Sequence, residues 1–162
     1  MVIAKEFGHS PSESSLWEIL SEIPDPEIPV INLVELGVIR KIEKNTDPEK
    51  IIVTVTPTYT GCPAKKLFND LILEKLAEHG FHKVEIISQN FPVWTTDWLS
   101  EETKAKLLKE GISPPTIGDK IIPCPRCKST DTKMVSAFGS TPCQSLYTCN
   151  QCQEPFNYFK CY

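Results

Sequence analysis

The sequence lacks long apolar runs and an excess of positive charge. No stretch reaches the roughly 18 consecutive apolar residues that indicate a membrane-spanning helix, so the sequence predicts no membrane span. The chain carries 17 Lys and Arg against 21 Asp and Glu, a formal net charge of −4. Surfaces that bind nucleic acid or anionic membranes need clustered positive charge. We therefore expect neither kind of partner.

Several catalytic signatures are also absent. The sequence contains no phosphate-binding P-loop, no dinucleotide fingerprint and no pattern typical of a Ser-His-Asp triad. The three histidines, His9, His79 and His82, have no metal-ligand spacing, and we assign them no role. A charged pair, Lys5 and Glu6, stands where a signal peptide would have its apolar core. We therefore expect a cytoplasmic protein.

Cysteine is the residue type that carries most information, with seven in 162 residues. Four form two matched pairs, Cys124-Pro-Arg-Cys127 and Cys149-Asn-Gln-Cys152. Two residues between thiolates let a tight turn direct both sulfur atoms at one ion, and two such turns complete the tetrahedral site that Zn²⁺ favours. We predict a Cys₄ zinc ribbon over residues 116–162; a redox or disulfide pairing of the same cysteines is the alternative.

Length supports the zinc assignment, because domains that approach about 40 residues commonly need metal or cross-links to fold. Residues 116–162 carry five positive and three negative side chains. Four thiolates with Zn²⁺ would cancel that surplus, and a neutral ribbon binds phosphate poorly. Cys143 and Cys161 are then left over, and we interpret them as buried or fortuitous thiols. The aromatic segment Phe156–Phe159 is typical of a packing or docking strand.

Residues 1–115 show the pattern of one small layered α/β (α+β) domain. Pro11 and Glu13 follow Ser10 as in a capping box, which predicts a helix with Ser10 as its N-cap. The remaining elements are predicted in the order strand, strand, helix, strand, helix. Their ranges are 37–43 and 50–56 (an antiparallel pair with its turn at 46–49), 63–79 with an apolar face of Leu67, Phe68, Leu71, Ile72 and Leu76, 84–89, and a helix capped by Ser100 that ends at Gly111.

Cys62 lies where a thiol can become reactive. Gly61-Cys62-Pro63 precedes the helix expected from Pro63, which predicts Cys62 as the helix N-cap with Lys65 and Lys66 in the first turn. The free N–H groups, the helix dipole and the lysines would each lower the pKa of the thiol and make it a nucleophile or soft-metal ligand. A small buried residue at a tight turn is the alternative.

Asp25-Pro-Glu27 places two carboxylates on a stiff loop. They could bind a cation, hydrogen-bond a partner's backbone or cap the segment Asn32–Leu36. Sequence physics alone favours capping and solvation.

Longer motifs carry a family resemblance. Three of them lie in the first domain: Asp25-Pro-Glu-Ile-Pro, Asn32-Leu-Val-Glu-Leu-Gly-Val-Ile39 and Thr56-Pro-Thr-Tyr-Thr-Gly-Cys-Pro-Ala64. They resemble the small α/β domain shared by SufT and the eukaryotic cytosolic iron–sulfur targeting factors.

Further motifs follow: Phe91-Pro-Val-Trp-Thr-Thr-Asp-Trp98, Gly111-Ile-Ser-Pro-Pro115, Cys124-Pro-Arg-Cys127, Phe138-Gly-Ser-Thr141 and Glu154-Pro-Phe-Asn-Tyr-Phe-Lys-Cys161. With them, nearly the whole chain resembles the PaaD family of phenylacetate-degradation accessory proteins.

The resemblance implies an accessory factor for the multicomponent phenylacetyl-CoA epoxidase that assists iron–sulfur cluster assembly or transfer, with the iron–sulfur reductase component as its client. It also implies that Cys62 is the functional thiol, a transient iron or cluster ligand, with Asp25 and Glu27 beside it. Two alternatives stay open: a structural subunit of the epoxidase complex, and a thiol-dependent enzyme that uses Cys62. The oligomeric state, a homo-oligomer included, stays open too.

Overall fold

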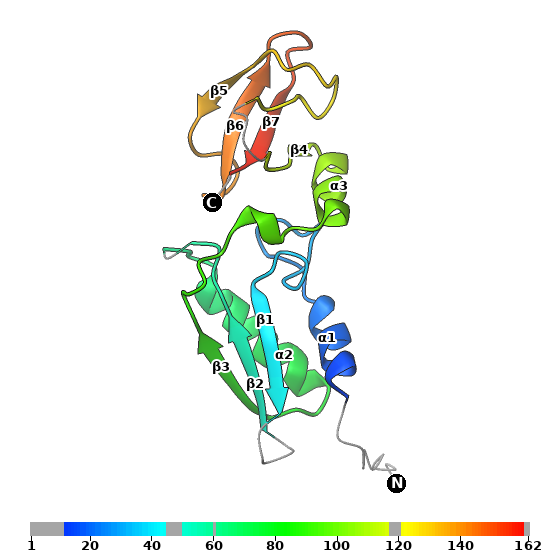
Figure 1. The fold of residues 1–162 in the computed structure, drawn as a ribbon, viewed down its shortest axis with the longest axis vertical. Helices are drawn as coiled ribbons and strands as arrows, with labels where there is room; N and C mark the ends of the chain where they lie inside the picture. The colour runs from blue at the N-terminus through cyan, green and yellow to red at the C-terminus, as the bar shows by residue number, and fades with distance from the viewer. Residues whose placement is uncertain (1–11, 45–49, 60, 117–120, 161–162) are drawn as a thin grey trace.

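The structure is a computed structural model that describes residues 12–44, 50–59, 61–116 and 121–160. Two units follow one another along the long axis of the molecule (Figure 1). The first contains α1 (Glu13–Ser21), β1 (Ile39–Lys44), β2 (Lys50–Val55), α2 (Lys65–Glu78), β3 (Lys83–Ser88), the short 3₁₀ helix η1 (Thr96–Trp98) and α3 (Glu101–Lys109). The second contains β4 (Ile112–Ser113), β5 (Thr132–Ser136), β6 (Gln144–Cys149) and β7 (Pro155–Phe159).

The first unit is a three-stranded sheet in the order β1-β2-β3. β1 and β2 are antiparallel, as predicted, and β3 pairs parallel to β2 after the crossover through α2. α1 and α2 contact each other, and the sheet contacts both helices through β1 and β3. Ile51, Val53 and Val55 of β2 are buried on one face of the sheet, since every second residue of a strand points to the same face. Thr54 is buried as well.

Most helix limits follow the local signals. Ser100 caps α3 as predicted, since its side-chain oxygen accepts the Thr103 N–H at 3.1 Å. Gly80 and Gly111 follow α2 and α3 with φ of +87° and +77°, which glycine adopts without strain. α1 begins at Glu13 with Ser12 as its N-cap. The predicted cap, Ser10, lies outside the described residues. The predicted turn at 46–49 lies outside them too.

The apolar face predicted for α2 is partly wrong. Its buried residues are Phe68, Ile72 and Leu76, one per turn. Leu71 is half-buried and packs against the core, whereas Leu67 is 45% exposed. The buried face of this helix is therefore narrower than the sequence pattern indicates.

The second unit is a four-stranded sheet in the order β4-β7-β6-β5. β4, only two residues long, directly follows α3 and pairs parallel to β7. β7 includes the aromatic segment and buries Phe156, Tyr158 and Phe159, which confirms its prediction as a packing strand. The domain boundary between residues 115 and 116 stays a prediction. β4 lies before this boundary, yet it pairs with β7 of the ribbon.

No helix among the described residues is long and apolar enough to cross a membrane.

Candidate functional site

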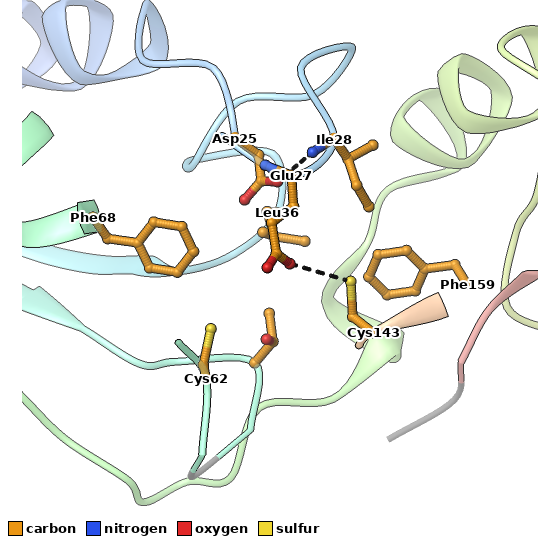
Figure 2. A pocket seen from close by; sticks show the side chains of 9 residues that line it. Asp25, Glu27, Ile28, Leu36, Cys62, Phe68, Cys143 and Phe159 are labelled. Atoms are coloured by element: carbon orange, nitrogen blue, oxygen red, sulfur yellow. Dashed lines mark hydrogen bonds between the residues drawn. The ribbon is translucent and has the colours of Figure 1, made fainter. Parts of the chain in front are cut away.

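A small cavity lies where the two units meet, with a volume of about 10 Å³. Figure 2 shows carboxylates from the loop between α1 and β1 on one side of it and thiols from two distant parts of the chain on the other. The polar groups that define it are Asp25, Glu27, Cys62 and Cys143. The remaining lining residues are Ile28, Leu36, Thr58, Phe68 and Phe159.

Asp25 holds its own loop in shape. One carboxylate oxygen, Oδ1, accepts the backbone N–H groups of Glu27 at 2.9 Å and Ile28 at 2.6 Å. The side chain is only 3% exposed, and burial raises the pKa of this carboxyl to about 6 although both hydrogen bonds oppose the shift. The expectation that it caps Asn32–Leu36 and is solvated is wrong, because Asn32 and Glu35 cap that segment.

Glu27 is half-buried and directed at the other unit. Its carboxylate lies between the two thiols in Figure 2, and Oε2 is 3.6 Å from the Cys143 Sγ, which donates to it. This contact joins residues that are 116 positions apart in the chain.

Cys62 lies beside the start of α2, but not at its N-cap. The helix begins at Lys65 and Ala64 is its N-cap, so the predicted capping position is wrong by two residues. The side chain is 8% exposed. Burial raises the pKa of the thiol, and the carboxylates of Glu27 and Asp25 raise it further, whereas hydrogen bonds from Ala64 and Thr58 lower it. The prediction of a lowered pKa is therefore wrong.

Cys143 is the pocket residue that sequence reasoning missed. It is a buried thiol, as predicted, at 5% exposure, and the structure adds its contact with Glu27. Burial raises the pKa of this thiol to about 12, although a hydrogen bond with the Thr141 side chain lowers it. No signal in the sequence predicts its neighbours, because they depend on how the two units pack.

The four paired cysteines form a second site at the far end of the ribbon. Their sulfur atoms all lie within 4.8 Å of one another, with Cys124 and Cys152 at 3.7 Å and Cys127 and Cys149 at 3.5 Å. A tetrahedron with metal–sulfur bonds of about 2.3 Å separates its sulfur atoms by about 3.8 Å. The donor set and its spacing therefore fit one four-coordinate ion of the Zn²⁺ type.

The backbone explains why these sulfur atoms converge. A residue with positive φ directly follows each pair, Lys128 at 65° and Gln153 at 62°. In each turn this residue donates its N–H to the carbonyl of the first cysteine, Lys128 to Cys124 at 2.9 Å and Gln153 to Cys149 at 3.0 Å. The two turns thus repeat one geometry, and Cys161 lies outside the described residues.

None of the described histidines lines the pocket. His79 and His82 are exposed, and His9 lies outside the described residues.

Two family models match separate parts of the chain. Residues 13–85 match the family model described as iron-sulfur cluster assembly protein, and residues 114–160 match the PaaD zinc beta ribbon domain. The crystal structure of DUF59, a domain of unknown function from Bacillus anthracis, covers 59% of this chain and 90% of its own at 23% identity, with a TM-score of 0.54. A conserved hypothetical protein from Thermotoga maritima covers 60% of this chain and 94% of its own at 22% identity, with a TM-score of 0.50.

These two solved structures share the fold of the first unit. A relative that spans nearly the whole chain is a protein of Escherichia coli (strain K12) whose name describes it as a putative subunit of 1,2-phenylacetyl-CoA epoxidase. It is 42% identical over 158 residues, which cover 93% of this chain and 94% of the relative. The chain therefore belongs to the PaaD family, in which an iron–sulfur cluster assembly domain precedes a zinc β-ribbon.

Proposed function

We propose that the protein is an accessory factor of phenylacetate catabolism that assists the maturation of phenylacetyl-CoA epoxidase by handling iron or an iron–sulfur cluster. The similarity to an epoxidase subunit over nearly the whole chain supports the pathway, and the match of residues 13–85 to an iron–sulfur cluster assembly domain supports the chemistry. Its partners are the other epoxidase components, with the iron–sulfur reductase component as the client. The cytoplasmic location stays a prediction.

The observation that carries the proposal is the pocket. Cys62 is distant in the sequence from Asp25 and Glu27, yet all three residues line one cavity. A thiol and a carboxylate are both ligands of iron. Cys62 is the residue that holds the cargo, Glu27 faces the same space, and Asp25 fixes the loop that carries Glu27.

The ribbon has a structural role in this proposal. Cys124, Cys127, Cys149 and Cys152 hold one Zn²⁺ whose four protein ligands leave no open position for water or substrate. When bound, the ion links the two turns, and the ribbon presents its sheet to the client.

Replacement of Cys62 tests the proposal. In a strain that lacks the protein, Cys62→Ala should fold and keep its zinc but fail to restore growth on phenylacetate and iron–sulfur content of the reductase component. Glu22→Gln, a change at an exposed glutamate paired with Lys75, is the control and should restore both. Full restoration by Cys62→Ala would show that this thiol has no role in maturation.

The name of the relative favours a second function, that of a structural subunit of the epoxidase complex. A subunit should co-purify with the other components in fixed stoichiometry, whereas a maturation factor should leave the active complex. A thiol-dependent enzyme is less well supported, because the buried Cys62 has a raised pKa and no histidine lies among the described residues that line its pocket.

A further inference from the structure

Four groups that can carry negative charge face the cavity between the two units. They are the carboxyl groups of Asp25 and Glu27 and the thiols of Cys62 and Cys143. No Lys, Arg or His is among the described residues that line it. Burial opposes ionisation of Asp25, Cys62 and Cys143, and the neighbouring carboxyl groups oppose it further. A bound cation would remove both penalties at once.

The ribbon contributes Cys143 from a well-defined position. The residue directly precedes β6, and its carbonyl accepts the N–H of Lys160 at 3.0 Å. The next residue, Gln144, pairs with Phe159 in the sheet, and Phe159 itself lines the cavity. The folded ribbon thereby fixes where the Cys143 thiol lies relative to the Cys62 loop (Figure 2).

We propose that Cys62, Cys143 and Glu27 bind one divalent transition-metal ion of the Fe²⁺ class between the two units. Asp25 is the positioning residue that holds the Glu27 loop. This inference rests on the proposed function, since it names the residues that hold the cargo, and it assigns to the ribbon a ligand outside its own Cys₄ site.

The donor set determines the class of ion. Two thiolates and one carboxylate suit iron, cobalt or zinc and disfavour Mg²⁺ and Ca²⁺, which prefer oxygen ligands only. A volume of about 10 Å³ leaves room for a single ion rather than a cluster. Both thiols release their protons to solvent as two metal–sulfur bonds form, so the step involves no oxidation or reduction.

Three protein ligands leave a coordination position open. Zinc sites of this kind exchange that position with water or substrate, and an open position would let a client ligand reach the ion. Among the described residues, the ribbon quartet is the group whose ligand atoms already converge as an ion requires. The pocket side chains must therefore close on the ion when it binds, which suits cargo that has to leave again.

Co²⁺ serves as the probe, because its thiolate complexes absorb light. Reduced full-length protein with zinc already in the ribbon is titrated with Co²⁺ without oxygen, and elemental analysis verifies that zinc stays bound. Wild type should bind one further ion per chain with thiolate-to-metal absorption. Cys62→Ser and Cys143→Ser should each bind Co²⁺ at least about tenfold more weakly, because removal of a metal ligand costs at least as much affinity as removal of a residue that only hydrogen-bonds to a ligand. Each variant should also lose about half of the thiolate-to-metal absorption per bound ion.

Two further variants complete the test. Glu27→Gln should weaken binding about tenfold but keep the full thiolate absorption, since both sulfur ligands remain. Met134→Leu, a change at an exposed side chain of the ribbon that does not line the cavity, is the control and should bind Co²⁺ as wild type does. Wild-type affinity and absorption in Cys143→Ser, or no cobalt beyond the ribbon, would overturn the inference.

The outcome is distinct from that of the growth test. If Cys143→Ser binds cobalt as wild type does while Cys62→Ala abolishes growth on phenylacetate, this inference fails and the maturation role stands. If both cysteines bind cobalt while Cys62→Ala supports full growth, the metal site stands and the maturation role fails.

Discussion

The rings of Trp94 and Phe159 pack against each other across the two units, with their centroids 6.1 Å apart and an interplanar angle of 49°. Both side chains are almost completely buried, and the indole N–H of Trp94 also donates to the carbonyl of Leu36 at 2.9 Å. Phe159 and Cys143 thus belong to the same hydrophobic core as the helices and sheet of the first unit. The ribbon is therefore part of the main core as well as a metal site.

Truncation of Phe159 should destabilise the whole protein. Phe159→Ala should lower the free energy of unfolding by about 3–5 kcal/mol, the usual cost of removing a buried phenylalanine ring. Denaturant titration monitored by tryptophan fluorescence measures the change. Phe138→Ala is the matched control, because Phe138 is 67% exposed in the same unit and surface changes stay within about 0.5 kcal/mol. Equal losses in both variants would contradict the shared core.

Removal of zinc should unfold the ribbon and disturb the first unit. Metal binding contributes about 10–16 kcal/mol in small zinc domains, so the sheet of β5, β6 and β7 should not survive a chelator. As Phe159 leaves Trp94, the tryptophan emission should shift to the red and recover when zinc returns. Circular dichroism should retain the helical signal, since α1, α2 and α3 all precede the ribbon. Unchanged emission in the metal-free protein would show that the contact between Phe159 and Trp94 does not depend on zinc.

The raised pKa of Asp25 predicts a pH-dependent stability. Because the folded-state pKa is about 6 against an ordinary value of 3.8, the native state holds this proton more tightly. Asp25 therefore makes the protein less stable as pH rises from about 4 to about 6, by up to about 3 kcal/mol, after which the loss is constant.

Asp25→Asn tests this prediction, since the amide oxygen can still accept the N–H groups of Glu27 and Ile28. With zinc in the ribbon and no other metal added, the variant should match wild type at pH 4 and exceed its stability at pH 7. A variant less stable than wild type at pH 7 would mean that the ionised carboxylate stabilises the loop. Glu18→Gln, on the exposed side of α1, controls for the change in net charge.

Both pocket thiols should resist alkylation in the native state. Cys62 and Cys143 are buried and their raised pKa values disfavour the thiolate, which is the form that reacts. Iodoacetamide labelling followed by peptide mass spectrometry should modify both at least about a hundredfold more slowly in native than in denatured protein. Rapid labelling of Cys62 alone in the native protein would indicate an open, reactive thiol.

The sequence predicts most of the fold because the signals involved are local. Ser100 and Gly111 delimit α3, and the β-branched run at 51–56 gives β2, whatever the rest of the chain does. The zinc quartet is equally local, since each pair of cysteines is fixed by one turn. These predictions need only a few neighbouring residues.

The pocket could not be predicted in the same way. Burial raises the pKa of Cys62, and the carboxylates of the distant residues Glu27 and Asp25 raise it further, so the thiolate expected from the helix dipole is disfavoured. The contact between Glu27 and Cys143 requires the loop after α1, the start of β6 and the packing of one unit on the other. No periodicity or spacing encodes such an arrangement.

The two residues of β4 have a consequence for how this architecture could arise or be re-engineered. β4 follows α3 after only two residues, yet its hydrogen-bonding partner is β7, the last strand of the chain. A graft of the ribbon onto a foreign host would have to begin at Ile112 to bring its outermost strand along. A graft that begins at the first metal-binding turn would lack β4, and the sheet would lose one of its edge strands.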